Sequence, residues 1–418
     1  MIAHTLHMTE TRLSNVLARR AVDRRDFLSR AAGLAAAAAT PGVLTARRES
    51  RPARRAAGGG AAPTLFAYVG CFSGGGRNAR GEGISVYRVG PDPDEWLLVQ
   101  LLQDRTSPSF LVRDPKRPLL YAVHERAGQA SVLRVDPRNG ELALVNQVAT
   151  GGLNPTHLAL DPTGRFLVIA NYGGGSVSVV PVLADGSLGA RSHLVALEGA
   201  LGPHKTEQST PHPHQCCFDP SGRHVAVPDK GLDRVFMFRL DPATGRLQAA
   251  DPPSVAARPG AGPRHLGFHP AAPFAYVINE LDSTVAVFRF EVASGALTPI
   301  QVVPSVPSSF AGPNTGAAIE VSRSGRYVYA SNRGHDSIVV FAVDPQQGTL
   351  TPRGWTSTGG RVPRFFCIDP SGTRVYAANQ GSDTIVSCRL NPSSGELTPT
   401  GRVIQSGSPT SIAFGPAG

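Results

Sequence analysis

The chain has 418 residues, including 46 glycines and 36 prolines, and only 17% of its residues are charged, a composition that suits a turn-rich β protein. Its net charge is +10, but eleven arginines and four acidic residues place +7 of that charge within residues 1–63. The rest of the chain lacks a basic stripe interleaved with aromatic residues, which argues against a nucleic-acid partner.

Residues 1–46 are predicted to be a twin-arginine-type signal region. Residues 23–28 read DRRDFL, which resembles the twin-arginine export motif, and an Ala-rich run from Ala31 to Thr40 follows. Such a short run is typical of a signal peptide rather than a membrane span. We therefore expect an extracytoplasmic protein, periplasmic or secreted, that uses the twin-arginine export machinery and has no membrane span; a disordered basic tail is the alternative. Residues 47–62 form a low-complexity linker.

From residue 63 to residue 418 the sequence predicts a single repeat domain. A cassette of about thirty residues recurs six times, at intervals of roughly 47–58 residues. Each copy contains a turn, an apolar run, a polar pair, a Gly-rich turn and a second β-branched run, which is typical of two strands of a β-propeller blade. The turns begin at Asp114, Asp161, Asp219, His269, Ser322 and Asp369.

The two ends of this domain are predicted to share a seventh blade. Residues 408–418 match the innermost strand of a blade, and residues 65–71 and 83–89 match its next two strands. Sharing one blade would close the ring and remove free strand edges. The prediction is an all-β, seven-bladed β-propeller; an open β-solenoid is the alternative, although it would not explain why the two ends are complementary.

The repeat also predicts where a site lies. The strand before each turn and the strand after it run antiparallel, so residues five before and eleven after the first turn residue should meet at the channel mouth. His214, Arg264, Glu280 and Arg333 occupy these positions in consecutive blades. A histidine and a carboxylate flanked by two guanidinium groups form a credible acid/base pair with an anion clamp. Alternatively, Arg264 and Glu280 only form an ion pair that steadies the mouth.

Further candidates lie in or beside the same ring. Substrate-binding roles are expected for Lys230, Glu125, His212 and Arg364. By contrast, we expect His157 and His265, four residues before their turns, to face the opposite side of the strand and to be buried between blades. The five cysteines form neither a disulfide framework nor a metal-ligand spacing. We expect no metal and no other cofactor, although Asn171 and Asp229 keep a metal-dependent alternative open.

Three segments resemble the lactonase family of seven-bladed propellers. They are residues 210–215 (TPHPHQ), 262–270 (GPRHLGFHP) and 275–281 (AYVINEL), and the likeness extends from Leu65 to Gly418. The family includes propeller-type bacterial 6-phosphogluconolactonases and the fungal carboxy-cis,cis-muconate cyclase. In the cyclase branch a His, an Arg, a Glu and a second Arg line the active site. The resemblance carries these roles onto His214, Arg264, Glu280 and Arg333.

The resemblance implies a metal-independent lactonase that hydrolyses a sugar or organic-acid lactone, and we expect the protein to be a monomer. Glu280 would activate water and His214 would move a proton to the leaving alkoxide, or the two would exchange roles. The arginines would hold anionic groups and stabilise charge on the carbonyl oxygen. Two alternatives remain: a muconate-type lactonising cycloisomerase, and a non-catalytic propeller that binds a glycan or protein. The apparent export signal departs from a cytoplasmic 6-phosphogluconolactonase and implies a different physiological lactone.

Overall fold

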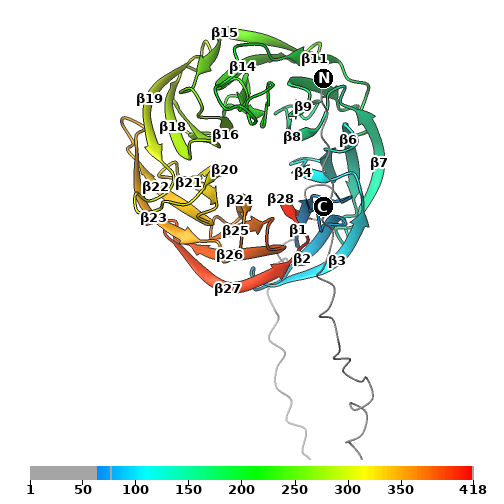
Figure 1. Ribbon diagram of the computed structural model, residues 1–418. Coiled ribbons are helices and arrows are strands. Elements are labelled where there is room, and N and C mark those ends of the chain that lie inside the picture. The colour runs from blue at the N-terminus through cyan, green and yellow to red at the C-terminus, as the bar shows by residue number, and fades with distance from the viewer. Residues whose placement is uncertain (1–63, 76–77, 417–418) are drawn as a thin grey trace, which may run out of the picture. The chain divides into compact units, whose positions relative to one another are not determined.

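Seven antiparallel sheets of four strands each make up the computed structural model, which describes residues 64–75 and 78–416. The sheets are arranged as blades around a ring, and the first strand of each blade lies nearest the centre (Figure 1). The predicted seven-bladed β-propeller is therefore confirmed. The predicted signal region (1–46) and linker (47–62) lie outside the described residues.

We number the blades from the first one that is continuous in sequence. Blades 1 to 3 contain β4 (Pro108–Arg113), β5 (Leu119–His124), β6 (Gln129–Val135), β7 (Leu142–Ala149), β8 (Pro155–Leu160), β9 (Phe166–Asn171), β10 (Ser176–Pro181), β11 (His193–Ala196), β12 (Cys217–Phe218), β13 (His224–Asp229), β14 (Arg234–Asp241) and β15 (Arg246–Ala256). Blades 4 to 6 contain β16 (Pro263–Phe268), β17 (Phe274–Asn279), β18 (Thr284–Phe290), β19 (Leu297–Pro304), β20 (Thr315–Val321), β21 (Tyr327–Arg333), β22 (Ser337–Val343), β23 (Leu350–Ser357), β24 (Pro363–Ile368), β25 (Arg374–Asn379), β26 (Thr384–Leu390) and β27 (Leu397–Gln405).

The seventh blade joins the two ends of the described chain. It contains β28 (Pro409–Pro416), β1 (Leu65–Cys71), β2 (Gly83–Val89) and β3 (Trp96–Gln103), in that order from the centre outward. β28 pairs antiparallel with β1, with Phe66 opposite Gly415 and Val69 opposite Ile412. Backbone pairing between the two ends therefore closes the ring, as the sequence predicted.

The core lies between neighbouring blades. The second strands are buried along their length, as in β9 and β17, because one face of each inner strand packs against the preceding blade and the other face against the following blade. In one such layer Val168 and Ala170 of β9 pack with Val225 and Val227 of β13. The outermost strands are partly exposed, which is consistent with a single covered face.

The repeated turn between the first and second strands has a local chemical cause. In blade 2, Oδ1 of Asp161 accepts hydrogen bonds from the backbone N–H groups of Arg165 and Phe166, both at 2.7 Å. Gly164 of the same turn adopts a φ of +76°, which only glycine enters without strain. These turns mark the end of each blade opposite the channel mouth with the predicted site.

Candidate functional site

A β-bulge places Arg264 at the channel mouth. On β16, Pro263 pairs with Asn279 of β17 and His265 pairs with Ile278, so Arg264 is an extra residue between them. Bulges bend the strand and re-aim side chains, and they occur often beside active sites. The corresponding pairs of blades 1, 2 and 6 show the same register shift, so the bulge belongs to the repeat.

Three cations surround the carboxylate of Glu280, which directly follows β17. Its Oε2 lies 2.9 Å from Nε of Arg264 and 3.1 Å from a terminal nitrogen of Arg333. Its Oε1 accepts a hydrogen bond of 3.4 Å from Nζ of Lys230. The structure thus brings together three of the four predicted catalytic residues and one predicted binding residue, from blades 3, 4 and 5.

The cluster is buried, so its charges interact strongly. Arg264 is 1% exposed, and its guanidinium also donates to the carbonyl oxygen of Ala317 at 2.5 Å. Burial acts to raise the pKa of Glu280, but the charges of Arg333, Arg264 and Lys230 outweigh it and hold that pKa far below its usual value. Glu280 is therefore a carboxylate whose oxygens are already engaged.

His214, the fourth predicted catalytic residue, lies beside the cluster. Pro213 bridges to Asp229, and the N–H of His214 donates to the carbonyl oxygen of Pro228 at 3.0 Å. The ring of His214 lies 5.1 Å from that of His265 and 5.6 Å from that of Tyr172, centroid to centroid. Burial, followed by the charge of Arg264, lowers the pKa of His214 well below 6.5, so its ring is neutral at neutral pH.

A small cavity lies beside His214 and Arg264 at the channel mouth. Its volume is about 10 Å³, which is room for about one water molecule. Within the described part of the chain, Nδ1 of His214 is buried without a hydrogen-bond partner. The cavity is lined by Ser109, Phe110, Glu125, Thr156, His214, Arg264, His265, Arg364, Phe365 and Thr410.

The expectation for His265 was wrong. Its ring lines this cavity and its Nε2 lies 3.4 Å from the Arg264 guanidinium. The bulge at Arg264 breaks the strict alternation of strand faces, so two consecutive side chains reach the channel. The expectation for His157 was wrong for the same reason: it follows the bulge of blade 2, its ring packs on Phe110, and it lies 5.7 Å from the ring of His265, two blades away, so it also faces the channel.

The other three predicted binding residues, Glu125, Arg364 and His212, make contacts outside the group around Glu280. Glu125 accepts a hydrogen bond of 3.3 Å from Thr156, and Arg364 lies over the ring of Phe72 at 4.9 Å. His212 stacks on Tyr172, with ring centroids 4.3 Å apart, and donates from Nδ1 to the Tyr172 carbonyl oxygen at 3.1 Å. His212 thus supports the wall of the mouth.

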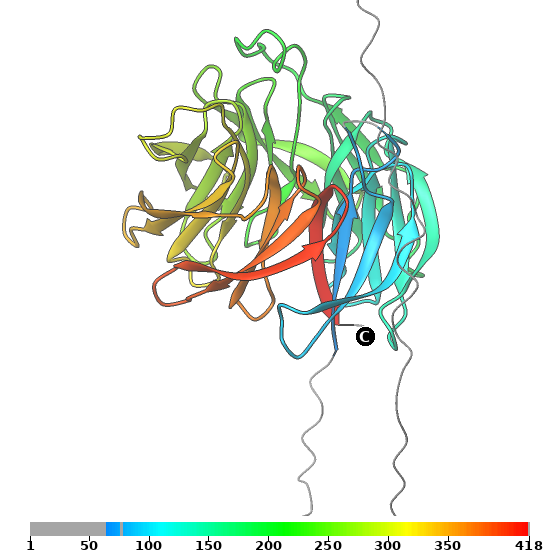
Figure 2. The same ribbon diagram turned by 60° about the horizontal axis from the view of Figure 1, so that its bottom comes forward.

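Sequence reasoning missed Tyr172 and Glu207. The Tyr172 ring lies 5.1 Å from Nζ of Lys230, and Oε2 of Glu207 accepts a hydrogen bond of 2.6 Å from the same atom. Glu207 belongs to residues 197–216, the long connection between β11 and β12, part of which projects in green from one end of the ring in Figure 2. The length of this loop was an available signal, because long structureless loops in compact domains are often functional.

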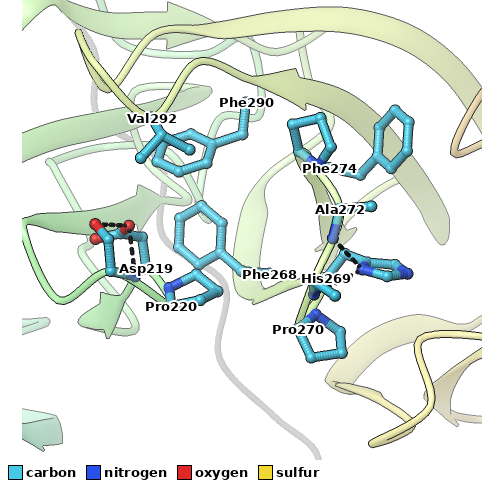
Figure 3. Close-up of a pocket in the computed structure, with 12 residues that line it drawn as sticks. Asp219, Pro220, Phe268, His269, Pro270, Ala272, Phe274, Phe290 and Val292 are labelled. Carbon is cyan, nitrogen blue, oxygen red and sulfur yellow. Dashed lines mark hydrogen bonds between the residues drawn. The ribbon is translucent and has the colours of Figure 1, made fainter.

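A larger cavity lies at the opposite end of the blades. It has a volume of about 400 Å³ and lies between the turns that begin at Asp219 and His269 (Figure 3). Phe268, Phe290 and Val292 line it, and it lacks the convergent charged groups of the channel mouth. Binding sites combine apolar walls with a few placed polar groups, so we place the candidate site at the mouth.

Two further observations concern only residues 64–75 and 78–416. They contain no group of three or more His, Cys, Asp or Glu residues that could hold a metal ion. In the same residues, no helix has the length and apolar character needed to cross a membrane.

Comparisons with known proteins agree with the fold. A family model described as "Lactonase, 7-bladed beta-propeller" matches residues 66–414. A 6-phosphogluconolactonase of Bacillus subtilis is 35% identical over 306 residues, covering 73% of this chain and 85% of its own. One from Formosa agariphila is 32% identical, covering 73% and 86%. The solved periplasmic gluconolactonase of Pseudomonas aeruginosa has a TM-score of 0.76 at 35% identity, covering 85% of this chain and all of its own.

Proposed function

Because this chain belongs to the lactonase family of seven-bladed β-propellers and is a lactone-hydrolysing enzyme of the 6-phosphogluconolactonase-like class, we propose that it opens a sugar or organic-acid lactone at the channel mouth. The single observation that carries this assignment is the buried group in which Arg264 and Arg333 share the carboxylate of Glu280, beside His214. A purely structural ion pair would need neither the second guanidinium nor the histidine.

The arginines stabilise the charge that develops during the reaction. When water attacks the lactone carbonyl, the carbonyl oxygen becomes an oxyanion. Two guanidinium groups that share one carboxylate keep an excess of positive charge, and in a buried site that excess stabilises an oxyanion strongly. Glu280 fixes both guanidinium planes, which makes it a positioning residue in this scheme.

His214 is the better candidate for the general base. The oxygens of Glu280 already face Arg264, Arg333 and Lys230, whereas Nδ1 of His214 is free and beside a cavity of the size of one water. His214 takes a proton as the water oxygen bonds to the carbonyl carbon. The ring C–O bond then breaks, and His214 returns the proton to the leaving alkoxide. The product is a hydroxy acid, and no metal or redox partner is required.

In this scheme the remaining candidates contact the substrate around its reacting group. Glu125 accepts hydrogen bonds from substrate hydroxyl groups, Arg364 and Lys230 donate to substrate oxygen atoms, and His212 supports Tyr172 beside them. Neither alternative gains support: the relatives described above bear lactonase names, and a scaffold has no need of a buried acid/base cluster. We propose that the enzyme acts as a monomer without a nucleic-acid partner.

We also propose that the enzyme works outside the cytoplasm. The motif at residues 23–28 is the basis, and a periplasmic gluconolactonase among the solved relatives supports it. Fusing residues 1–46 to a reporter that is active only after export tests this directly. Replacing Arg24 and Arg25 by lysine should abolish export, and export that persists would contradict the twin-arginine route.

Acid release provides the test of function. Purified full-length protein with EDTA is placed in a pH-stat with glucono-, 6-phosphoglucono- and muconolactone substrates, against the spontaneous rate. Release above the blank for at least one lactone is expected. A folded protein that accelerates none of them would overturn the assignment.

A further inference from the structure

We propose that Glu207 makes this enzyme selective for unphosphorylated lactones, an inference that rests on the proposed lactonase function. The basis is the position of Lys230, whose Nζ lies 2.6 Å from Oε2 of Glu207 and 3.4 Å from Oε1 of Glu280. Lys230 is the cation of the cluster closest to the β11–β12 loop, and two carboxylates already share its charge.

Glu207 lies on the solvent side of this pair. The side chain of Lys230 is 2% exposed, whereas that of Glu207 is 47% exposed. An anionic group that approaches Lys230 from solvent therefore meets the Glu207 carboxylate first. The Tyr172 ring, 5.1 Å from Nζ, and the carboxylate of Glu280 occupy further sides of the ammonium group.

The fold holds Glu207 in this position. The next residue, Gln208, is 1% exposed, and its side-chain amide donates to the carbonyl oxygen of Lys230 at 2.8 Å. Its Oε1 accepts from the N–H of His204 at 3.0 Å, which ties the loop to itself. The loop is thereby attached to Lys230, the residue whose charge Glu207 neutralises, so the fold itself keeps Glu207 and Lys230 together.

The mouth is consequently asymmetric in charge. At the centre, two guanidinium groups share one carboxylate and can stabilise one developing negative charge. At the loop end, one ammonium group faces two carboxylates and cannot compensate a phosphate dianion. Selectivity of this kind comes from a repulsive element placed against the wrong ligand. A neutral polyhydroxy lactone avoids that repulsion.

The test is the ratio of kcat/KM for glucono-δ-lactone to kcat/KM for 6-phosphoglucono-δ-lactone, at low and at high salt. Glu207→Gln removes the charge and keeps the shape. Glu198→Gln makes the same change on an exposed residue of the same loop. We expect wild type to favour the unphosphorylated lactone and Glu207→Gln to shift the ratio toward the phosphorylated one by about tenfold, less at high salt. The Glu198→Gln control should keep the wild-type ratio.

Two results would overturn the inference: a wild type that prefers the phosphorylated lactone, or a Glu207→Gln ratio equal to that of the control. Absence of turnover of both lactones would instead contradict the proposed function. In that event the dissociation constants of gluconate and 6-phosphogluconate, measured by calorimetry, test the selectivity without requiring turnover. Glu207→Gln must then strengthen the binding of 6-phosphogluconate relative to that of gluconate. An unchanged ratio of the two dissociation constants rejects the role of Glu207.

Discussion

Arg264 and Glu280 meet across the β16–β17 pair, with Nε and Oε2 2.9 Å apart, because the bulge at Arg264 turns its side chain toward the residue that follows β17. The same carboxylate also faces Arg333 and Lys230. One anion therefore organises three cations from three blades, and this arrangement determines how the mouth responds to substitution.

Replacing Glu280 by glutamine should destabilise the fold. The change leaves buried cations without their shared anion, and breaking a buried ion pair from one side costs about 3–5 kcal/mol. We expect the free energy of unfolding, measured in urea, to fall by about 3 kcal/mol. Glu95→Gln, at the exposed pair with Arg402, is the control and should cost less than about 1 kcal/mol. Equal effects of the two changes would show that the cluster is not strongly coupled.

Replacing His214 by glutamine should mainly lower kcat. Loss of a general base typically lowers the rate about 10²–10⁴-fold, and KM should change much less. His269→Gln alters a histidine at the opposite end of blade 4 and should keep kcat close to that of wild type. Circular dichroism checks that both variants are folded. A folded His214→Gln variant with wild-type kcat would remove His214 from the mechanism.

Arg264→Lys keeps the positive charge but should still impair catalysis. Arg264 contacts Glu280 through Nε and the Ala317 carbonyl through a terminal nitrogen, and lysine cannot make both contacts in one plane. We expect kcat/KM to fall by about 10²-fold or more, as for loss of an oxyanion donor. If lysine supports wild-type kcat/KM, charge alone is sufficient at this position.

Glu320, on the innermost strand β20 of blade 5, should make stability depend on pH. Burial raises the pKa of Glu320 from 4.5 to about 8. A hydrogen bond of 3.0 Å from the N–H of Ile368 acts in the opposite direction but does not outweigh burial. Between these values the folded state holds a proton that the unfolded state has released, so this contribution to stability is lost as pH rises from about 4.5 to about 8.

Urea unfolding between pH 5 and pH 8 measures this slope. Glu320→Gln cannot titrate, so the variant should lose about 3–4 kcal/mol less stability than wild type across this range. The exposed residue Glu396 provides the control, because Glu396→Gln should leave the wild-type slope unchanged. If the free energy of unfolding changes equally with pH in wild type and Glu320→Gln, Glu320 is not held in its uncharged form by burial.

The sequence was sufficient to predict the ring because its period is encoded in every blade by the same turn and the same apolar runs. The ring closure was equally predictable from complementary ends. Positions in the repeat also predicted correctly that Arg264, Glu280 and Arg333 lie close together. The predictions for His265 and His157 were wrong because the bulged residue before each of them breaks the alternation of the strand faces. Glu207 was missed because it lies in a loop that has no counterpart in the repeat, so repeat position says nothing about it.

The most direct test of the site is acid release by full-length wild type and by the double variant His214→Ala/Glu280→Gln, with EDTA present and both proteins shown to be folded. We predict that wild type hydrolyses a lactone well above the spontaneous rate and that the double variant falls to that rate. Turnover retained by the folded double variant would show that the chemistry takes place elsewhere in the molecule.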